Sequence, residues 1–384
     1  MLTKNIKFKN YIVRSNISKV KREFKKFVSK ENEILSSLSL KYKYSYSKRI
    51  IKKYKNFSKL QIIGIGGSTL GTEAIYSFLR DKIKKNFFFI NTIKNETPRN
   101  KGKKTLNLIV SKSGNTLETI SNSNIFINKN DKNIFITENK QNYLHSLAQK
   151  LKADIVHHNN YIGGRYSVLS EVGMLPAELM GLKSKNFRQF NSLIKNTKFM
   201  NSLVQNVSST LYFLKNKKFN SVILNYDEMS QNLFYWYQQL IAESLGKKNK
   251  GLLPIVSSVP KDNHSVMQLY LDGFKNNFYT FFYVHGRRNE KINKDKILIS
   301  QKFLKNKTVN EIVYAQKKAT EKVFNKKNIP FRSFEIKSRD EKTLGELFCF
   351  FILETILIGK CLKINPYDQP AVELIKKQTK KLLI

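Results

Sequence analysis

Two turns rich in glycine and hydroxyl side chains are the first places in the sequence where chemistry is indicated. The first turn, Gly64-Ile-Gly-Gly-Ser68, follows an apolar run at 60–63 and precedes a segment with helical spacing at 72–79. A strand, a glycine turn and a helix N-terminus suit an anion, because glycine lets the backbone approach the ligand and free N–H groups point toward it. The hydroxyls of Ser68 and Thr69 suit a sugar or a single phosphate, whereas a tight turn that binds nothing is the alternative.

Two familiar phosphate motifs do not fit this turn. A dinucleotide fingerprint needs a third glycine where Thr69 stands and an acidic residue after the next strand, which ends instead at Asn91. A P-loop needs a lysine where Thr72 stands, although Gly66 and Gly71 have the required spacing.

The second turn, Ser111-Lys-Ser-Gly-Asn-Thr116, also lies between a strand-like run, at 106–110, and a predicted helix. Its hydroxyls, its lysine and the free N–H groups of the helix could together bind three phosphate oxygens. A capping box with Asn115 or Thr116 at the N-cap would explain the same residues without a ligand. Two such turns on neighbouring strands nevertheless favour a phosphate site. The residues predicted to bind the phosphate are Ser111, Lys112, Ser113 and Thr116.

A carboxylate and a guanidinium are candidates for the reaction itself. Glu243 and Gln239 are four residues apart in a predicted helix at 230–247, so they share one face of it. Glu243 could act as a general base, although a solvated glutamate near a helix end is the simpler explanation. Gly163-Gly164-Arg165 presents a guanidinium at a helix start, where it could stabilise an anion or pair with a carboxylate.

The sequence around His264 and Lys376 does not by itself indicate a catalytic role for either residue. A single histidine is usually structural, and Lys376 stands in a lysine-rich helical pattern that indicates solvated charges. None of the five histidines pairs with a cysteine or glutamate at metal-ligand spacing, so we expect no metal.

The composition limits the classes of function. The chain has 384 residues, of which 41% are hydrophobic, and a formal net charge of +42. The lysines are spread from end to end without a nucleic-acid-binding motif, so we expect no specific nucleic-acid partner. The apolar stretch at 347–358 contains Glu354 and is too short to span a bilayer, and the first residues lack the apolar core of a signal peptide. Two cysteines in an apolar segment suggest a reduced, cytoplasmic protein.

The elements that must position these residues alternate along the chain. Apolar strands separated by helices predict an α/β fold with doubly wound parallel sheets, which bind ligands beyond the carboxyl ends of their strands. We expect the segment 1–45 to form helices on the outside of the first domain and the chain to end in two helices. The predicted strands are 62–64, 87–91, 106–110, 133–137 and 154–156, and then 221–225, 252–259 and 278–284.

Five motifs in order identify the chain as a member of a known family. The two turns resemble those of sugar-isomerase (SIS) domains, and Gly163-Gly-Arg-Tyr-Ser167 resembles a signature of the glucose-6-phosphate isomerase family. The segment 239–247 is similar to the family segment with the catalytic glutamate. His264 and Val372-Glu-Leu-Ile-Lys376 have similar counterparts, although Ala371 and Ile375 replace glycines and Lys377 is adjacent.

The resemblance implies two SIS-type doubly wound domains with parallel sheets flanked by helices, plus helical N- and C-terminal extensions. The implied boundaries are 1–45 for the first extension, 46–184 and 185–330 for the domains, and 331–384 for a C-terminal segment that completes the site. The implied reaction is the interconversion of glucose 6-phosphate and fructose 6-phosphate in glycolysis and gluconeogenesis. The family is typically homodimeric and needs no redox or metal cofactor.

The resemblance also implies roles for individual residues. Glu243 would be the base, Arg165 would stabilise the enediolate, and His264, donated by the partner subunit, would open the sugar ring with Lys376. Gly67, Ser68 and Gln239 would contact the sugar.

One departure from the family keeps other activities open. Gly114-Asn115 stands where many relatives have Phe-Thr, so an isomerase for another sugar phosphate, such as mannose 6-phosphate, is an alternative. A non-catalytic sugar-phosphate sensor is another, but it would not need Glu243, His264 and Lys376 together.

Overall fold

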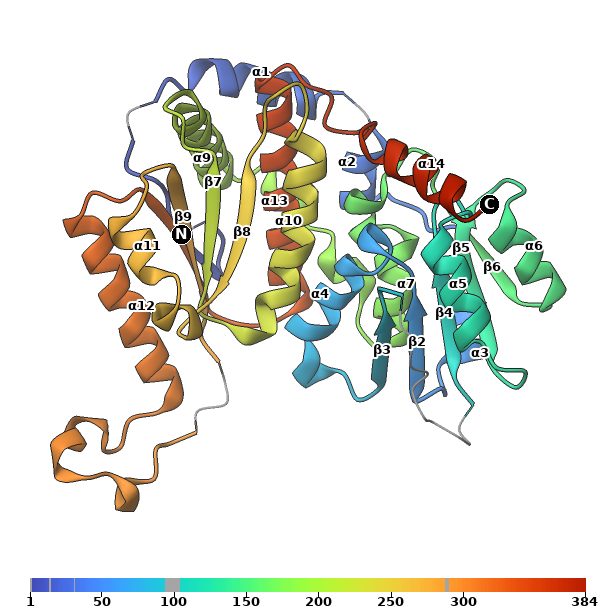
Figure 1. Cartoon of the computed structure of the whole chain (residues 1–384), viewed down its shortest axis with the longest axis horizontal. Helices are drawn as coiled ribbons and strands as arrows, with labels where there is room; N and C mark the ends of the chain where they lie inside the picture. Colours follow the sequence, from blue (N-terminus) through green and yellow to red (C-terminus); the bar gives the residue numbers. More distant parts are fainter. Residues whose placement is uncertain (1, 14, 31, 94–103, 287–289) are drawn as a thin grey trace.

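The computed structural model describes residues 2–13, 15–30, 32–93, 104–286 and 290–384. Within them, two five-stranded sheets stand side by side, with helices between them and on their outer faces (Figure 1). The predicted α/β class with largely parallel sheets is therefore confirmed.

The first sheet has the strand order β3-β2-β4-β5-β6, and all of its strands are parallel. Every strand predicted for it is present, with ends that differ by a few residues. Its strands are β2 (Lys59–Ile63), β3 (Asn86–Ile90), β4 (Leu106–Val110), β5 (Lys132–Glu138) and β6 (Asp154–His158). The helices of this half are α3 (Lys48–Tyr54), α4 (Leu70–Phe78), α5 (Leu117–Phe126), α6 (Tyr143–Lys150) and α7 (Glu171–Leu179).

The second sheet has the order β1-β10-β9-β7-β8, and only β1 is antiparallel to its neighbour. Its strands are β1 (Ile6–Lys9), β7 (Asn220–Asn225), β8 (Leu253–Ser258), β9 (Asn277–Val284) and β10 (Phe331–Ile336). The other helices are α1 (Ser18–Val28), α2 (Glu33–Leu38), α8 (Phe190–Leu193), α9 (Thr197–Lys215), α10 (Gln231–Leu245), α11 (Met267–Asp272), α12 (Val309–Lys326), α13 (Glu341–Cys361) and α14 (Val372–Leu382).

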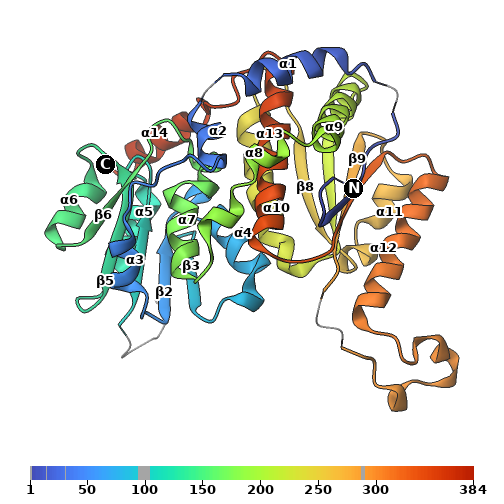
Figure 2. The same cartoon turned by 180° about the vertical axis from the view of Figure 1, so that it is seen from behind.

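Both ends of the chain differ from the sequence expectation. The segment 1–45 was expected to be helical and to lie on the first domain, but it contributes β1 to the second sheet, and α1 packs on α9 and α13 (Figure 2). The segment 331–384 begins with a strand, β10, rather than a helix. Arg332 and Glu335 of β10 are buried by partners from distant segments, so the sequence Phe-Arg-Ser-Phe-Glu-Ile lacks the apolar run that marked the other strands.

One apolar core joins the two halves of the molecule. It extends from the first sheet through α4, α10 and α13 to the second sheet, and α4 packs directly against α10. Most residues of α13 are buried, and they belong to this core. Because α4 and α10 are packed together, side chains from both halves can be held in one fixed site.

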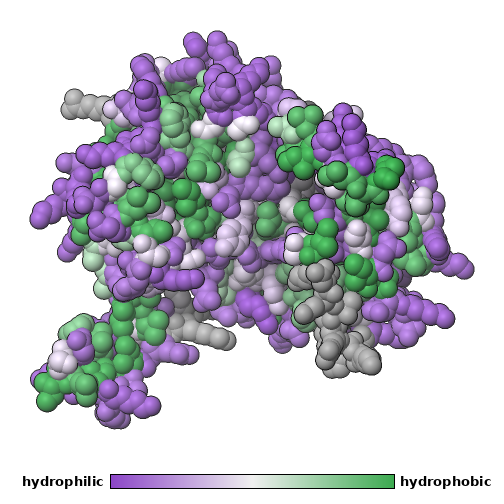
Figure 3. Space-filling view, viewed as in Figure 1, coloured by the Kyte–Doolittle hydropathy of each residue, from purple (hydrophilic) through white to green (hydrophobic). Residues whose placement is uncertain are grey.

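Hydrophilic and apolar side chains are unevenly distributed over the surface. Figure 3 shows many hydrophilic side chains on one face, together with apolar patches on the main body and on the segment that projects at its lower left. This segment includes the exposed side chains of Leu298, Ile299 and Phe303. In the described part of the chain, no helix combines the length and the apolar character needed to cross a membrane.

A buried ion pair links the second sheet to α13. Arg332 of β10 is hydrogen-bonded to Glu354 of α13, and both side chains are only 2% exposed. Asn206 also binds both charged groups, and the Tyr237 hydroxyl donates to Glu354 Oε2 at 2.8 Å. Tyr237 belongs to α10, so this network fixes the helix that carries Gln239 and Glu243.

Replacing Glu354 with glutamine should destabilise the fold strongly. The change leaves the Arg332 charge buried without a counter-charge, which typically costs about 3–5 kcal/mol. Chemical denaturation measures the difference in unfolding free energy. The exposed pair of Lys53 and Asp154 is the control, and Asp154→Asn should cost at most about 1 kcal/mol. Similar losses in the two variants would show that the buried network does not stabilise the fold.

Candidate active site

The turns 64–68 and 111–116 follow two neighbouring strands of the first sheet, at the point where the strand order changes direction. The chain moves from β2 to β3 on one side and from β4 to β5 on the other, so the carboxyl ends of β2 and β4 are neighbours. Ile63 of β2 pairs with Ile109 of β4, which places the following turns at the same level. In doubly wound sheets, ligands bind at such a reversal.

The glycine turn is shaped by close contact between two backbones. Gly67 lies in the 3-10 helix η1 (Gly66–Ser68), against the 3-10 helix η3 (Gly164–Leu169) that carries Arg165. A Cβ atom on Gly67 would stand 2.2 Å from the Gly164 carbonyl carbon and 2.6 Å from the Arg165 nitrogen. Glycine is therefore required here to bring Arg165 to the turn. Ser68 is partly exposed next to it.

The second turn leaves the N-terminus of α5 without a side-chain cap. Thr116 is the N-cap residue, but its hydroxyl pairs with the Ser111 hydroxyl at 2.9 Å instead of capping the helix. The capping-box explanation of this turn is therefore wrong. Ser113 is exposed, and Lys112 donates to the Asn160 carbonyl at 2.7 Å, so that its ammonium is bound away from the hydroxyls.

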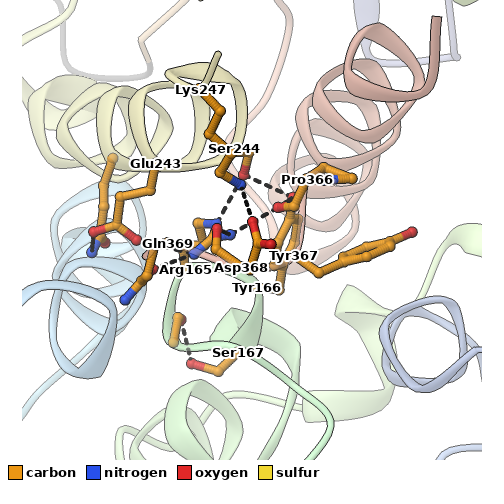
Figure 4. A network of polar contacts seen from close by, with 12 residues as sticks. Arg165, Tyr166, Ser167, Glu243, Ser244, Lys247, Pro366, Tyr367, Asp368 and Gln369 are labelled. Atoms are coloured by element: carbon orange, nitrogen blue, oxygen red, sulfur yellow. Dashed lines mark hydrogen bonds and ion pairs between the residues drawn. The ribbon is translucent and has the colours of Figure 1, made fainter. Parts of the chain in front are cut away.

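Arg165 is the centre of a polar network that joins three parts of the chain (Figure 4). Its side chain is 2% exposed, and each of its five N–H donors has an acceptor. Nε donates to Ser244 Oγ at 2.8 Å and one terminal nitrogen donates to the carbonyls of Pro366 and Asp368 at 2.8 and 3.0 Å. The other terminal nitrogen donates to Glu243 and to Gln369.

Glu243 is held by both of its carboxylate oxygens. Oε1 accepts from Gln239 Nε2 at 2.8 Å, and Oε2 accepts from Arg165 at 3.2 Å. The side chain is 26% exposed, at a cleft of about 590 Å³ that α10 forms with the segment 364–372. A carboxylate that is oriented but still accessible is suited to take a proton from a bound ligand. Gln239 and Glu243 share one face of α10, as predicted, and the structure brings Arg165 to the same carboxylate.

A second ion pair, between Lys247 and Asp368, lies next to Arg165 and Glu243. Lys247, two residues beyond the end of α10, donates to Asp368 at 2.8 Å and to the Asn365 carbonyl at 2.6 Å. The hydrogen bond from Lys247 lowers the pKa of Asp368, so the aspartate remains charged at neutral pH. Burial raises the pKa of Tyr166, whose hydroxyl donates to the Pro366 carbonyl at 3.0 Å.

His264 is not part of this group. It ends the 3-10 helix η6 (Lys261–His264) beyond the carboxyl end of β8, and its side chain is exposed. Gln231, the first residue of α10, accepts a hydrogen bond from Ser258 at that same end of β8. Glu243 lies about 18 Å of helix further along α10. Within one chain, His264 and Glu243 therefore lie at opposite ends of α10.

Lys376 is also separate from the group in this structure. It lies on α14, has a side chain that is 63% exposed, and forms an ion pair with Glu373 at 2.6 Å. None of the residues of α14 is buried. Val372, at its start, nevertheless lines the cleft beside Glu243, so Lys376 is one turn of helix away from that cleft.

The sequence did not predict three kinds of hydrogen-bond partner of Arg165: Ser244, Gln369 and the backbone carbonyls of Pro366 and Asp368. Ser244 follows the predicted base directly and binds Arg165, and Gln369 opens the C-terminal segment that carries Lys376. Ser244 is adjacent to Glu243 in a segment already singled out, whereas Gln369 lies seven residues before Lys376 and had no such neighbour. The carbonyls of Pro366 and Asp368 have no sequence signature, because every residue has a carbonyl.

A methyl group on Gly67 should separate η1 from η3. Gly67→Ala would force two backbones apart, and overpacking of this kind costs about 1–3 kcal/mol. Thermal unfolding of Gly67→Ala and of a control variant, compared with the wild type, measures the loss of stability. Gly164→Ala is the matched control, because a Cβ there is 3.6 Å from its nearest neighbour and should cost nothing or stabilise by up to about 1 kcal/mol. Equal unfolding temperatures for both variants would contradict the close-contact explanation.

Comparisons with known proteins agree with this geometry. A family model described as phosphoglucose isomerase matches residues 48–383. The glucose-6-phosphate isomerase of Methanocaldococcus jannaschii is 32% identical over 351 residues, which cover 85% of this chain and 85% of that protein. The glucose-6-phosphate isomerase of Campylobacter jejuni is 29% identical over 357 residues, with 88% of each chain covered.

Solved structures show the same fold. A hypothetical protein of Thermus thermophilus superposes with a TM-score of 0.83 at 22% identity, covering 96% of this chain and 94% of that one. A glucose-6-phosphate isomerase of Chlamydia trachomatis superposes with a TM-score of 0.71 at 19% identity, covering 95% of this chain and 77% of that one. From the family model and the sequence identity together, the chain belongs to the phosphoglucose isomerase family.

Proposed function

We propose that this chain is an aldose–ketose isomerase that interconverts glucose 6-phosphate and fructose 6-phosphate, a step of glycolysis and gluconeogenesis. The observation that carries the proposal is the Glu243 carboxylate, oriented by Gln239 and Arg165 at an open cleft. Curated relatives named for this activity share about 30% of the sequence over most of the chain, and the family model agrees.

The proton transfer is assigned to Glu243 and Arg165. Moving the carbonyl from C1 to C2 requires removal of the proton on C2 and its return to C1. One carboxylate beside both carbons can do both steps, with an enediolate between them. Negative charge then develops on the oxygens of C1 and C2. The guanidinium of Arg165 is held in place by its hydrogen bonds to the protein, and its positive charge would stabilise this negative charge electrostatically.

Substrate binding is assigned to the two turns and to Gln239. The hydroxyls of Ser111, Ser113 and Thr116, together with the uncapped N–H groups of α5, supply donors for the phosphate oxygens. Lys112 would add positive charge nearby. The sugar would lie between these donors and Glu243, with Gly67, Ser68 and Gln239 along it. Gln239 Oε1 is buried and has no hydrogen-bond partner among the described residues, so it is available to accept from a sugar hydroxyl.

Ring opening is assigned to His264, with help from Lys376. Opening the hexose ring requires a proton at O5 and loss of a proton at O1, for which an imidazole is suited at neutral pH. We propose that His264 enters the site of a partner subunit in a homodimer, because its own Glu243 lies at the far end of α10. The exposed apolar side chains of Leu298, Ile299 and Phe303 offer surface for such an association.

The cellular setting and the alternatives follow from the same residues. We propose a cytoplasmic protein, because Cys349 and Cys361 are buried as free thiols. A sensor that only binds sugar phosphate would not need a carboxylate that is oriented and accessible. Mannose 6-phosphate differs from glucose 6-phosphate only in the configuration at C2. An isomerase for mannose 6-phosphate is therefore distinguished by an activity assay with each sugar phosphate.

The first test compares the wild-type chain with Glu243→Gln in a coupled assay of fructose 6-phosphate conversion. The variant keeps the size of the side chain and removes the base, so kcat should fall by about 10³-fold or more. Glu23→Gln, on α1, is the control and should keep wild-type activity.

Full activity in Glu243→Gln would move the base elsewhere. Calorimetric binding of the sugar phosphate without turnover by the wild type would favour the sensor, and turnover of mannose 6-phosphate alone would change the substrate.

The second test asks whether His264 acts across a subunit interface. His264→Ala and Glu243→Gln should each be nearly inactive, but an equal mixture refolded or expressed together should regain about a quarter of wild-type activity. Half of the randomly paired dimers are mixed, and each mixed dimer has one intact site of its two. If the histidine acted within its own chain, the mixture would stay as inactive as the single variants.

A further inference from the structure

The segment that connects α13 to α14 forms one wall of the candidate site. Its residues 365–369 pass over Arg165, and two of their carbonyls, those of Pro366 and Asp368, accept hydrogen bonds from the guanidinium. Gln369, at the end of the segment, binds the same guanidinium nitrogen as Glu243 does. The orientation of Arg165 and the position of Gln369 therefore depend on where this segment lies.

Burial alone does not fix the segment. Pro366 is buried, but Asn365 and the side chains at 367–369 are exposed, so the last part of the segment gains little from apolar packing. Besides the buried Pro366 and the contact between the rings of Tyr367 and Tyr166, the segment is held by polar contacts. On one side these are the contacts of Arg165 and of the Tyr166 hydroxyl, which belong to the first half of the molecule.

On the other side the segment is held by Lys247. The ammonium group is within 2.8 Å of Asp368 and 2.6 Å of the Asn365 carbonyl, and the Lys247 side chain is only 12% exposed. Asn365 in turn donates to the second carboxylate oxygen of Asp368 at 2.9 Å. Figure 4 shows Lys247, just beyond the end of the helix that carries Glu243, reaching toward Asp368.

We propose that Lys247 and Asp368 are positioning residues for the isomerisation, which fix the segment 365–369 so that Arg165 and Gln369 face the reacting carbons. The proposal rests on the proposed function of this site. Because Lys247 directly follows the helix that carries Glu243, the pair sets the distance between the base and the groups that stabilise the enediolate.

The effect of this pair should fall on kcat rather than on KM. The phosphate donors belong to the turn 111–116 and to α5, and none of their hydrogen bonds involves the segment 365–369. Loss of the pair would leave substrate binding through the phosphate intact. It would misplace Arg165 and Gln369 at the other end of the substrate, where a shift of about 1 Å can cost about 100-fold in rate.

The stability of the fold should change little, because Asp368 is 52% exposed and an exposed partner makes a weak ion pair. This separates a positioning role from a structural one. A structural role would lower the unfolding temperature and reduce activity through loss of folded protein.

The test measures kcat and KM for fructose 6-phosphate in Lys247→Met, Asp368→Asn and the double variant. Each single variant should lose about 10- to 100-fold in kcat with KM within about twofold of the wild type. The double variant should be no worse than the poorer single variant, because both changes break the same contact between Lys247 and Asp368. Lys247→Arg, which can still donate to both acceptors, should recover most of the activity. Lys322→Met, on an exposed part of α12, is the control for loss of one positive charge.

Three results would overturn the proposal. The first is an active wild type whose Lys247→Met variant keeps its kcat. The second is a loss of rate in the double variant equal to the product of the two single losses. The third is a fall in activity that follows the unfolding temperature, without rescue by Lys247→Arg. A wild type with no isomerase activity would instead overturn the proposed function, and the positioning role with it.

Discussion

The guanidinium of Arg165 is the group on which the arrangement of the site depends. A buried cation is stable only when its donors are satisfied, and here all five are. The acceptors come from α10 and from the segment after α13, while Arg165 itself belongs to the first half of the chain. Placing this one residue therefore requires that both sheets, α10 and the C-terminal segment be assembled together. The core shared by α4, α10 and α13 provides that assembly.

The three cations discussed for the site, Arg165, Lys247 and Lys112, each lie close to a carboxylate. Arg165 is matched by Glu243, Lys247 by Asp368, and Lys112 lies 3.6 Å from Glu138. The hydroxyls of the turn 111–116 and the first N–H groups of α5, which have no side-chain cap, are the donors proposed for the phosphate. The base and the stabilising cation can then be placed at the other end of the sugar, where the reacting carbons would lie.

The sequence predicted the parts of the fold and site that have a local signature. The strands of the first sheet are apolar runs bounded by turns, and the two turns stand where the strands end. β1 and β10 escaped prediction because one has only four residues and the other buries Arg332 and Glu335 through partners remote in sequence. Gln369 and the carbonyls around Arg165 could not be chosen from the sequence, because only the folded chain brings residues 366–369 to residue 165. The distance between His264 and Glu243 likewise depends on the direction of α10.

The central claim is that a side-chain base carries the hydrogen between C1 and C2 as a proton. The most direct measurement is conversion of fructose 6-phosphate in D₂O, with deuterium at C2 of the glucose 6-phosphate read by NMR. A proton held by an accessible carboxylate can exchange with solvent before it returns, so the account predicts deuterium at C2 of the product. Full conversion with no deuterium at C2 would indicate a direct hydride shift between the carbons and would contradict the role assigned to Glu243.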